Sequence, residues 1–152
     1  MPGSVTTPDN TTLNLYFNPL WKVGRWTVEA VQMIASVAMV AGEAIYAVGD
    51  GTHTKTAAGL GNFKGILLEK IAATDADYAT SKKLRLVAVP LSPDAEAQFA
   101  VGAGTFTNAD VGKSVQCNDS LGLAVDTAGT FARITKYLTS SRGVCSFSLT
   151  IS

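Results

Sequence analysis

Charged side chains are scarce in this chain. Asp, Glu, Lys and Arg make up 16% of its 152 residues, against about 25% in a typical soluble domain. Twelve basic residues balance twelve acidic ones, whereas nucleic-acid binding relies on clustered positive charge. The nearest approach to a cluster is Lys82, Lys83 and Arg85, so we expect no nucleic-acid partner. Either the β-layers are thick, or a partner covers part of the surface.

Residues that commonly carry catalysis or bind metals are also few. The single histidine, His53, lies in the polar segment 50–56, and the chain has no G-x-S-x-G motif to supply a nucleophile. Asp75 could begin a calcium loop, but Thr80 and Leu86 stand where an EF-hand needs Gly and Glu. We therefore expect a solvated loop histidine, no metal, no cofactor and no enzymatic activity.

The two cysteines and the apolar runs further limit the class of protein that this chain can be. Cys117 and Cys145 have no metal or redox spacing, and both fall on the apolar phase of predicted strands. We expect them to be free and buried, with a cross-strand disulfide as the open alternative. The longest apolar stretch, residues 28–41, is interrupted by polar residues and is shorter than the roughly 20 residues of a membrane span. With no secretory signal at the start, we expect a soluble protein with no membrane partner.

Short strands separated by turn residues dominate the rest of the chain. Cys145, Phe147, Leu149 and Ile151 alternate with Ser or Thr, the period of a strand with one wet face. The other predicted strands are residues 44–48, 65–69, 84–91, 97–101, 114–117, 123–127 and 131–138. Eight or nine short antiparallel strands with such turns predict an all-β fold, a single small barrel or sandwich.

Two segments need separate comment. Residues 84–91 are apolar on both faces after Arg85, which predicts a central or sandwiched strand. In residues 27–41, Ala30, Met33, Ile34, Val37, Ala38 and Ala41 follow helical spacing. The same stretch could form two short buried strands, and we favour the strands.

The N-terminus is expected to form an extended arm, residues 1–21, ahead of a β-domain of residues 22–152. Its first 18 residues carry one charge, Asp9, and are rich in Thr, Asn and Pro, so they cannot offset their ordering entropy alone. The arm ends in apolar side chains that either pack on their own domain or dock on a neighbouring subunit. As candidate partner-binding residues we take Leu13, Leu15, Tyr16, Phe17, Leu20, Trp21 and Trp26.

A weak internal echo suggests two four-strand halves, residues 37–101 and 110–152. Gly42-Glu43-Ala44-Ile45 is similar to Gly112-Lys113-Ser114-Val115, and residues 65–69 are similar to residues 122–126. Chance similarity between short strands that begin with Gly is the alternative. The strand order of the two halves decides between them.

Three segments together resemble a known family. They are Val40-Ala41-Gly42-Glu43-Ala44-Ile45-Tyr46, Gly61-Asn62-Phe63-Lys64-Gly65-Ile66, and the valine-rich residues 84–89. Over about residues 37–101 this pattern looks like the small capsid decoration, or cement, proteins of tailed bacteriophages. The similarity consists of strand starts rather than a functional motif, and the arm with its aromatic group does not match it.

The resemblance implies a non-enzymatic structural protein of the virion. Such proteins bind the outside of the assembled head, often as homotrimers, and clamp neighbouring major capsid protein subunits. It implies synthesis in the host cytoplasm and a final place on the capsid exterior. The alternatives are a β-sandwich binding module for carbohydrate, receptor or tail-tip adhesion, and a small enzyme. Exposed aromatics on a flat face would favour the binding module, but Tyr46, Tyr78 and Tyr137 are scattered along the chain.

Overall fold

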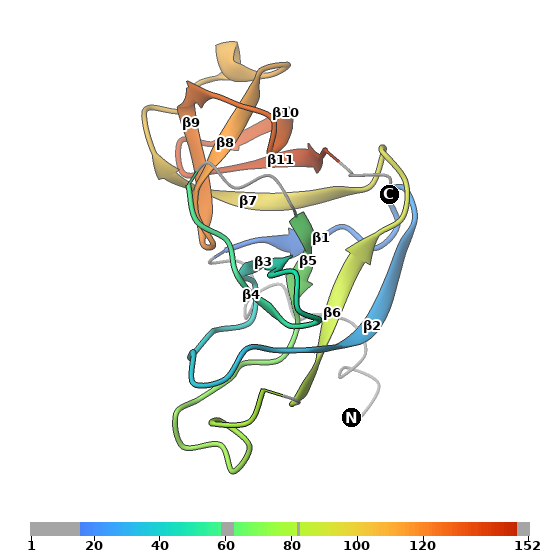
Figure 1. The fold of residues 1–152 in the computed structure, drawn as a ribbon. Helices are drawn as coiled ribbons and strands as arrows, with labels where there is room; N and C mark the ends of the chain where they lie inside the picture. The colour runs from blue at the N-terminus through green and yellow to red at the C-terminus, as the bar shows by residue number, and fades with distance from the viewer. Residues whose placement is uncertain (1–15, 59–62, 82, 149–152) are drawn as a thin grey trace, which may run out of the picture.

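The computed structural model describes residues 16–58, 63–81 and 83–148, and these residues form an all-β fold (Figure 1). A 3-10 turn at Asn108–Asp110 accompanies the strands. The strands are β1 (Asn18–Pro19), β2 (Trp26–Gln32), β3 (Ala44–Ala47), β4 (His53–Lys55), β5 (Phe63–Leu67), β6 (Leu84–Pro90), β7 (Glu96–Ala103), β8 (Ser114–Asp119), β9 (Gly122–Ala128), β10 (Ala132–Thr139) and β11 (Arg142–Phe147). The predicted all-β class is confirmed.

The strands divide into two sheets, with sheet A in the upper half of Figure 1. Sheet A has the order β1-β7-β11-β10-β8-β9, and β7 also pairs with β9. That second pairing joins the two ends of a five-strand series, so β7, β11, β10, β8 and β9 form a closed ring. It is parallel, whereas the other strand pairings are antiparallel as predicted.

Sheet B contains five strands in the order β2-β6-β5-β3-β4. The strand β6 lies between β2 and β5, so the predicted interior position of residues 84–91 is confirmed. A parallel bridge between Met33 and His53 brings the end of β2 close to β4. Sheet B is therefore also strongly curved.

Because side chains alternate between the two faces of sheet B, each face packs into its own hydrophobic cluster. Ala44, Ile66 and Ala88 face sheet A and join a large cluster that includes all six phenylalanines, Phe17, Phe63, Phe99, Phe106, Phe131 and Phe147. Their neighbours Ile45, Leu67 and Val87 face the other way, into a second cluster with Met33, Met39 and Ile71. Sheet B is thus buried on both faces where sheet A covers it.

Residues 27–41 are not helical. The first part is strand β2, which confirms the strand that we favoured. The second predicted strand is wrong: beyond β2 only isolated bridges form, at Met33 and at Met39 with Ile71. Ser36 adopts a positive φ of 59°, which breaks the extended conformation there.

Both cysteines are free and buried, as predicted. Burial raises the pKa of the Cys117 thiol, and it raises the pKa of the Cys145 thiol as well. A thiol reacts through its thiolate, so these two groups are chemically inert in the folded chain.

The proposed halves do not share a strand order. In the first, β3 pairs with β5 and β5 with β6, while β7 joins the other sheet. In the second, β8 pairs with both β9 and β10, and β10 pairs with β11. The internal echo between these segments is therefore not a structural repeat.

Candidate docking surface

The last part of the predicted arm packs on its own domain. Phe17 is fully buried, its ring centroid lies 5.8 Å from that of Phe147, and its N–H donates to the carbonyl of Gly42 at 3.0 Å. The next two residues form β1, which pairs with β7. These residues belong to the folded domain, because packing their large apolar side chains into the core removes apolar surface from water.

The other candidate partner-binding residues are also committed to the domain. Trp21 and Trp26 are half-buried against the large core, with their ring centroids 6.1 Å apart. Tyr16 and Leu20 are half-buried too, whereas Leu13 and Leu15 lie outside the described residues. The described aromatic side chains therefore stabilise the domain itself, and their role toward a partner stays a prediction.

The most exposed apolar side chains of sheet B gather on β2 and β6. Val28 is 47% exposed, Leu84 54% and Leu86 40%, and Ala30 between them is exposed as well. Ala30 lies opposite Leu86, while Gln32 lies opposite Leu84. Directly opposite side chains in an antiparallel pair are about 5 Å apart, so Val28, Ala30, Leu84 and Leu86 form one continuous surface, the apolar strip.

Strand alternation explains why this surface is apolar. Side chains two residues apart share a face of a sheet, so Leu84 and Leu86 lie on the same face as Ala88. Ala88 is buried beneath sheet A, but the strip extends beyond that cover. The sequence signal was the apolar run of residues 84–91, which predicts a central or sandwiched strand but does not show where the covering sheet ends.

The backbone of β2 adds hydrogen-bonding groups beside the strip. The carbonyl of Arg25 accepts from the N–H of Leu91, and the N–H of Met33 donates to the carbonyl of Lys83. In an antiparallel pair alternate residues exchange these bonds, so the backbone groups of Val28 and Ala30 point away from β6. Because β2 is an end strand of sheet B, it offers a template on which an extended segment can pair.

Charged groups occupy the opposite face of β6. The guanidinium of Arg85 donates to Asp77 at 2.8 Å and to Asp75 at 3.1 Å. The ammonium group of Lys83, 3% exposed, donates to the carbonyls of Ile34, Tyr78 and Thr80 at 2.7, 2.9 and 2.8 Å. These contacts tie residues 75–80 to the side of β6 opposite the strip.

The ion pairs on this loop predict acid sensitivity. The N–H of Ala72 and the Arg85 guanidinium lower the pKa of Asp75 below 3.8, and Arg85 lowers the pKa of Asp77. Since both folded pKa values are depressed, the two carboxylates stabilise the fold above pH 3.8, and this stabilisation is lost as pH falls through the folded values. We expect Arg85→Met to lower the melting temperature at pH 7, with the difference from wild type shrinking as the pH falls below 3.8. Thermal melts between pH 7 and pH 2 measure it, and a difference that stays constant with pH would contradict it.

The single histidine is not a free loop residue. His53 lies in β4, half-buried, and its Nδ1 is 2.9 Å from the carbonyl oxygen of Gln32. The expectation of a solvated loop was wrong because Asp50 and Gly51 form a tight turn that starts a strand immediately afterwards. Thr52 donates to the Asp50 carboxylate in that turn.

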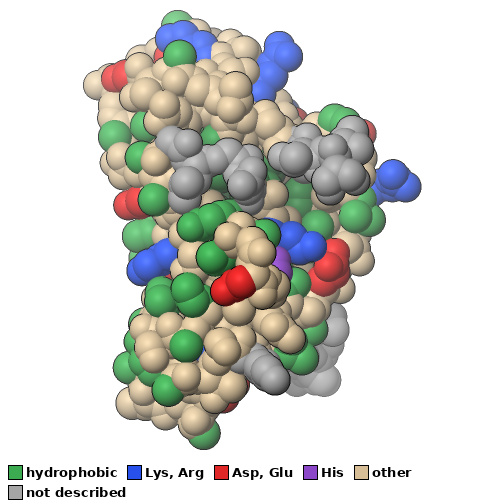
Figure 2. All heavy atoms as spheres, viewed as in Figure 1, with side chains coloured by type: hydrophobic (Ala, Val, Ile, Leu, Met, Phe, Trp, Pro, Cys, Tyr) green, Lys and Arg blue, Asp and Glu red, His purple; other side chains and the backbone are tan. Residues whose placement is uncertain are grey.

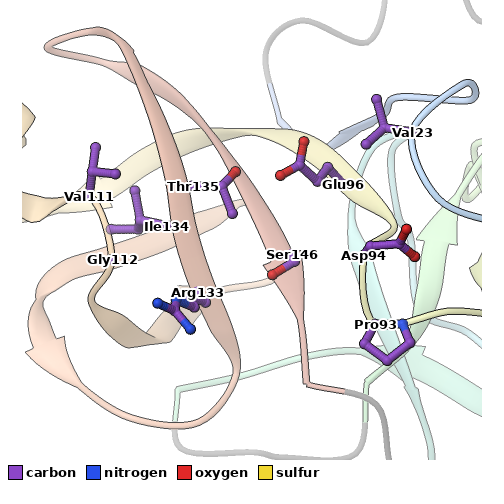
Figure 3. Close-up of a pocket in the computed structure, with 10 residues that line it drawn as sticks. All are labelled: Val23, Pro93, Asp94, Glu96, Val111, Gly112, Arg133, Ile134, Thr135 and Ser146. Carbon is purple, nitrogen blue, oxygen red and sulfur yellow. The ribbon is translucent and has the colours of Figure 1, made fainter.

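A shallow hollow of about 550 Å³ lies on sheet A (Figure 3). Glu96, Ser146 and Arg133 are neighbours there on β7, β11 and β10, with Asp94 at the rim (Figure 3). Ser146 has no imidazole beside it, since the chain's one histidine lies in sheet B. The hollow therefore combines charges of both signs on an open surface.

Other features of the described residues complete the surface. Figure 2 shows one face on which charged side chains are few and scattered. Tyr46, Tyr78 and Tyr137 lie on β3, in the loop before β6 and on β10, so they do not form a common platform. Within residues 16–58, 63–81 and 83–148, no three His, Cys, Asp or Glu side chains group as metal ligands. No helix among them has the length and hydropathy to cross a bilayer.

Among the described residues, the apolar strip is therefore the candidate docking surface. No protein-family model matches the chain, and no curated protein matches it either.

Proposed function

We propose that this chain is a non-enzymatic structural protein that binds the outer surface of a phage head and clamps adjacent major capsid subunits. The apolar strip is the observation that carries the proposal, because it is an exposed apolar surface on two paired strands. The resemblance of residues 37–101 to capsid decoration proteins gives the partner. The capsid exterior is then its location, and a homotrimer its expected form.

The chemistry of the strip suits attachment to a repeating lattice. Its side chains are uncharged, so docking requires little desolvation of ions, and burial of apolar area drives association. The outward backbone groups of Val28 and Ala30 add hydrogen bonds that fix the orientation of an extended capsid segment. A standard interface buries roughly 1,600 Å² in total, so the strip is the centre of the contact and its surroundings are the rim.

Clamping follows from mass action. A protein that binds only the assembled shell stabilises that shell, because dissociation of the subunits must also break the bound contacts. Each occupied site contributes, so the stabilisation of a head grows with the fraction of sites that are filled.

We expect the double substitution Leu84→Asp and Leu86→Asp to abolish decoration while the domain stays folded. Both side chains are largely exposed, so the fold loses little, but two carboxylates on the strip would be desolvated in the complex. Loss of a central apolar contact typically costs about 1–2 kcal/mol of binding, so the pair should weaken the affinity by about 30-fold or more. Co-sedimentation with undecorated heads measures the affinity.

The matched control places the same charges elsewhere. Val111, in the turn before β8, is 40% exposed, and Leu138, on β10 of sheet A, is 45% exposed; their double replacement by Asp should leave binding unchanged. Equal loss in both variants would show that charge alone prevents binding. Full binding by the strip variant would refute the strip as the docking surface.

A further inference from the structure

The ammonium group of Lys83 lies inside the fold and is surrounded by backbone carbonyls. Lys83 is almost fully buried. Its Nζ donates to the carbonyls of Ile34, Tyr78 and Thr80 at 2.7, 2.9 and 2.8 Å, which uses all the N–H donors of the group. Among the described residues no carboxylate forms a salt bridge with it. Neutral peptide oxygens therefore hold this buried charge, as they hold free cations in carbonyl-lined sites.

Two loops supply these carbonyls. Ile34 follows β2, whereas Tyr78 and Thr80 lie in the segment before β6. The N–H of Ser36 donates to the same Tyr78 carbonyl at 2.9 Å, and Ser36 has its positive φ of 59° in this position. Carbonyl oxygens carry partial negative charge and repel one another at short range. A cation between them is what allows the two loops to meet.

The geometry selects a class of cation. The carbonyl oxygens lie 2.7 to 2.9 Å from the Nζ, farther than the about 2.3–2.6 Å of calcium ligands or the about 2.0–2.1 Å of magnesium ligands. Divalent sites are also built with carboxylates, whereas these oxygens are neutral. Burial lowers the pKa of Lys83, and the nearby Asp77 carboxylate opposes this shift. The site therefore suits a large monovalent cation that carries N–H donors.

We propose that the carbonyls of Ile34, Tyr78 and Thr80 form a binding site for a primary ammonium ion, which the chain fills with the tethered group of its own lysine. In the wild-type chain the tether keeps the site occupied, because an attached group has a high effective concentration. Without that side chain, the same carbonyls bind a free alkylammonium ion. The proposal goes beyond the proposed function and does not depend on which partner the apolar strip meets.

Chemical rescue of Lys83→Ala in the full chain tests the site. The substitution removes the side chain beyond Cβ, and the missing part has the size and charge of propylammonium. Loss of the charge-assisted hydrogen bonds should lower the melting temperature by about 10 °C or more. Propylammonium chloride at about ten times its dissociation constant should then raise it by about 3–6 °C. Tetramethylammonium chloride has the same charge but no N–H donor, and it should have no such effect.

Two further variants are the matched controls. Lys83→Met keeps an apolar side chain of similar length in the site, so propylammonium has no room there and should leave the melting temperature unchanged. Lys113→Ala removes a lysine that also bonds to oxygen, in the Asp110 carboxylate at 2.7 Å. Because the Lys113 side chain is 57% exposed, no enclosed site is left behind, and this variant should not respond either.

Backbone carbonyl chemical shifts give a second measurement, which reports on the site itself. In Lys83→Ala the carbonyl resonances of Ile34, Tyr78 and Thr80 should move together and saturate as propylammonium is added. If this variant is unfolded in buffer, propylammonium but not tetramethylammonium should restore its circular dichroism spectrum. Equal effects of the two salts, an equal response of either control variant, or a Lys83→Ala chain that propylammonium leaves unchanged would each overturn the proposal.

Discussion

Phe147→Ala should unfold this protein at temperatures where the wild type is stable. The Phe147 side chain is 4% exposed, its ring stacks on that of Phe63 with centroids 4.1 Å apart, and it also contacts Phe17 and Phe131. Truncation of a buried Phe costs about 3–5 kcal/mol. The cost should lie at the upper end, because the cavity would open between two sheets that cannot move together without breaking other contacts.

Thermal melting and urea denaturation measure this loss. For a chain of this size 1 kcal/mol corresponds to about 2–4 °C in melting temperature, so we expect a drop of about 10 °C or more. Phe147→Leu keeps most of the volume and should lose about half as much or less. A melting temperature near that of the wild type for Phe147→Ala would mean that the last strand is wrongly phased.

Deletion of residues 1–19 is expected to be nearly as damaging, although the same segment would be dispensable if it were only an arm. The deletion removes Phe17 from the core and removes β1, whose Asn18 and Pro19 pair with Gln98 and Ala97. The lost phenylalanine alone accounts for about 3–5 kcal/mol. β7 is also left with an unpaired edge inside the protein.

Deletion of residues 1–15 is the control, because it keeps Tyr16, Phe17 and β1. Its melting temperature should stay within a few degrees of the full chain. Circular dichroism melts of both truncations, at matched concentration, separate the two outcomes. If the chain lacking residues 1–19 melts like the chain lacking residues 1–15, the Phe17 contact does not stabilise the fold.

The sequence predicted the strands better than their arrangement. Alternation and turn residues located eight strands within a few residues of their observed bounds, from β3 to β11, because both signals are local. The two short strands β1 and β4 were missed: a two-residue strand has no period, and His53 stands in a polar run. Which strands belong to which of the two sheets was not predicted, since that depends on pairings between residues distant in sequence, such as Asn18 with Gln98.

For the candidate docking surface, too, sequence alone does not show which apolar side chains another layer covers. The apolar cluster that ends the arm was expected either to pack on its own domain or to dock on a neighbouring subunit, and the structure places its described members against their own domain. Leu84 and Leu86 belong to the run that was predicted as a central or sandwiched strand, and an apolar residue has the same pattern in sequence whether or not another layer covers it. Only the place where sheet A ends distinguishes Ala88 from Leu86.

The pairing of β1 with β7 has a consequence for how the chain is made. Asn18 is translated 80 residues before its partner Gln98. Glu43 is translated 77 residues before Ser120, whose buried hydroxyl donates a hydrogen bond to the Glu43 carboxylate. Contacts so distant in sequence close slowly, so the N-terminal half emerges from the ribosome with Phe17 still exposed. A nascent chain stalled before β7 therefore exposes the apolar side chain of Phe17 to chaperones. The native state is reached only after nearly the whole polypeptide has been released.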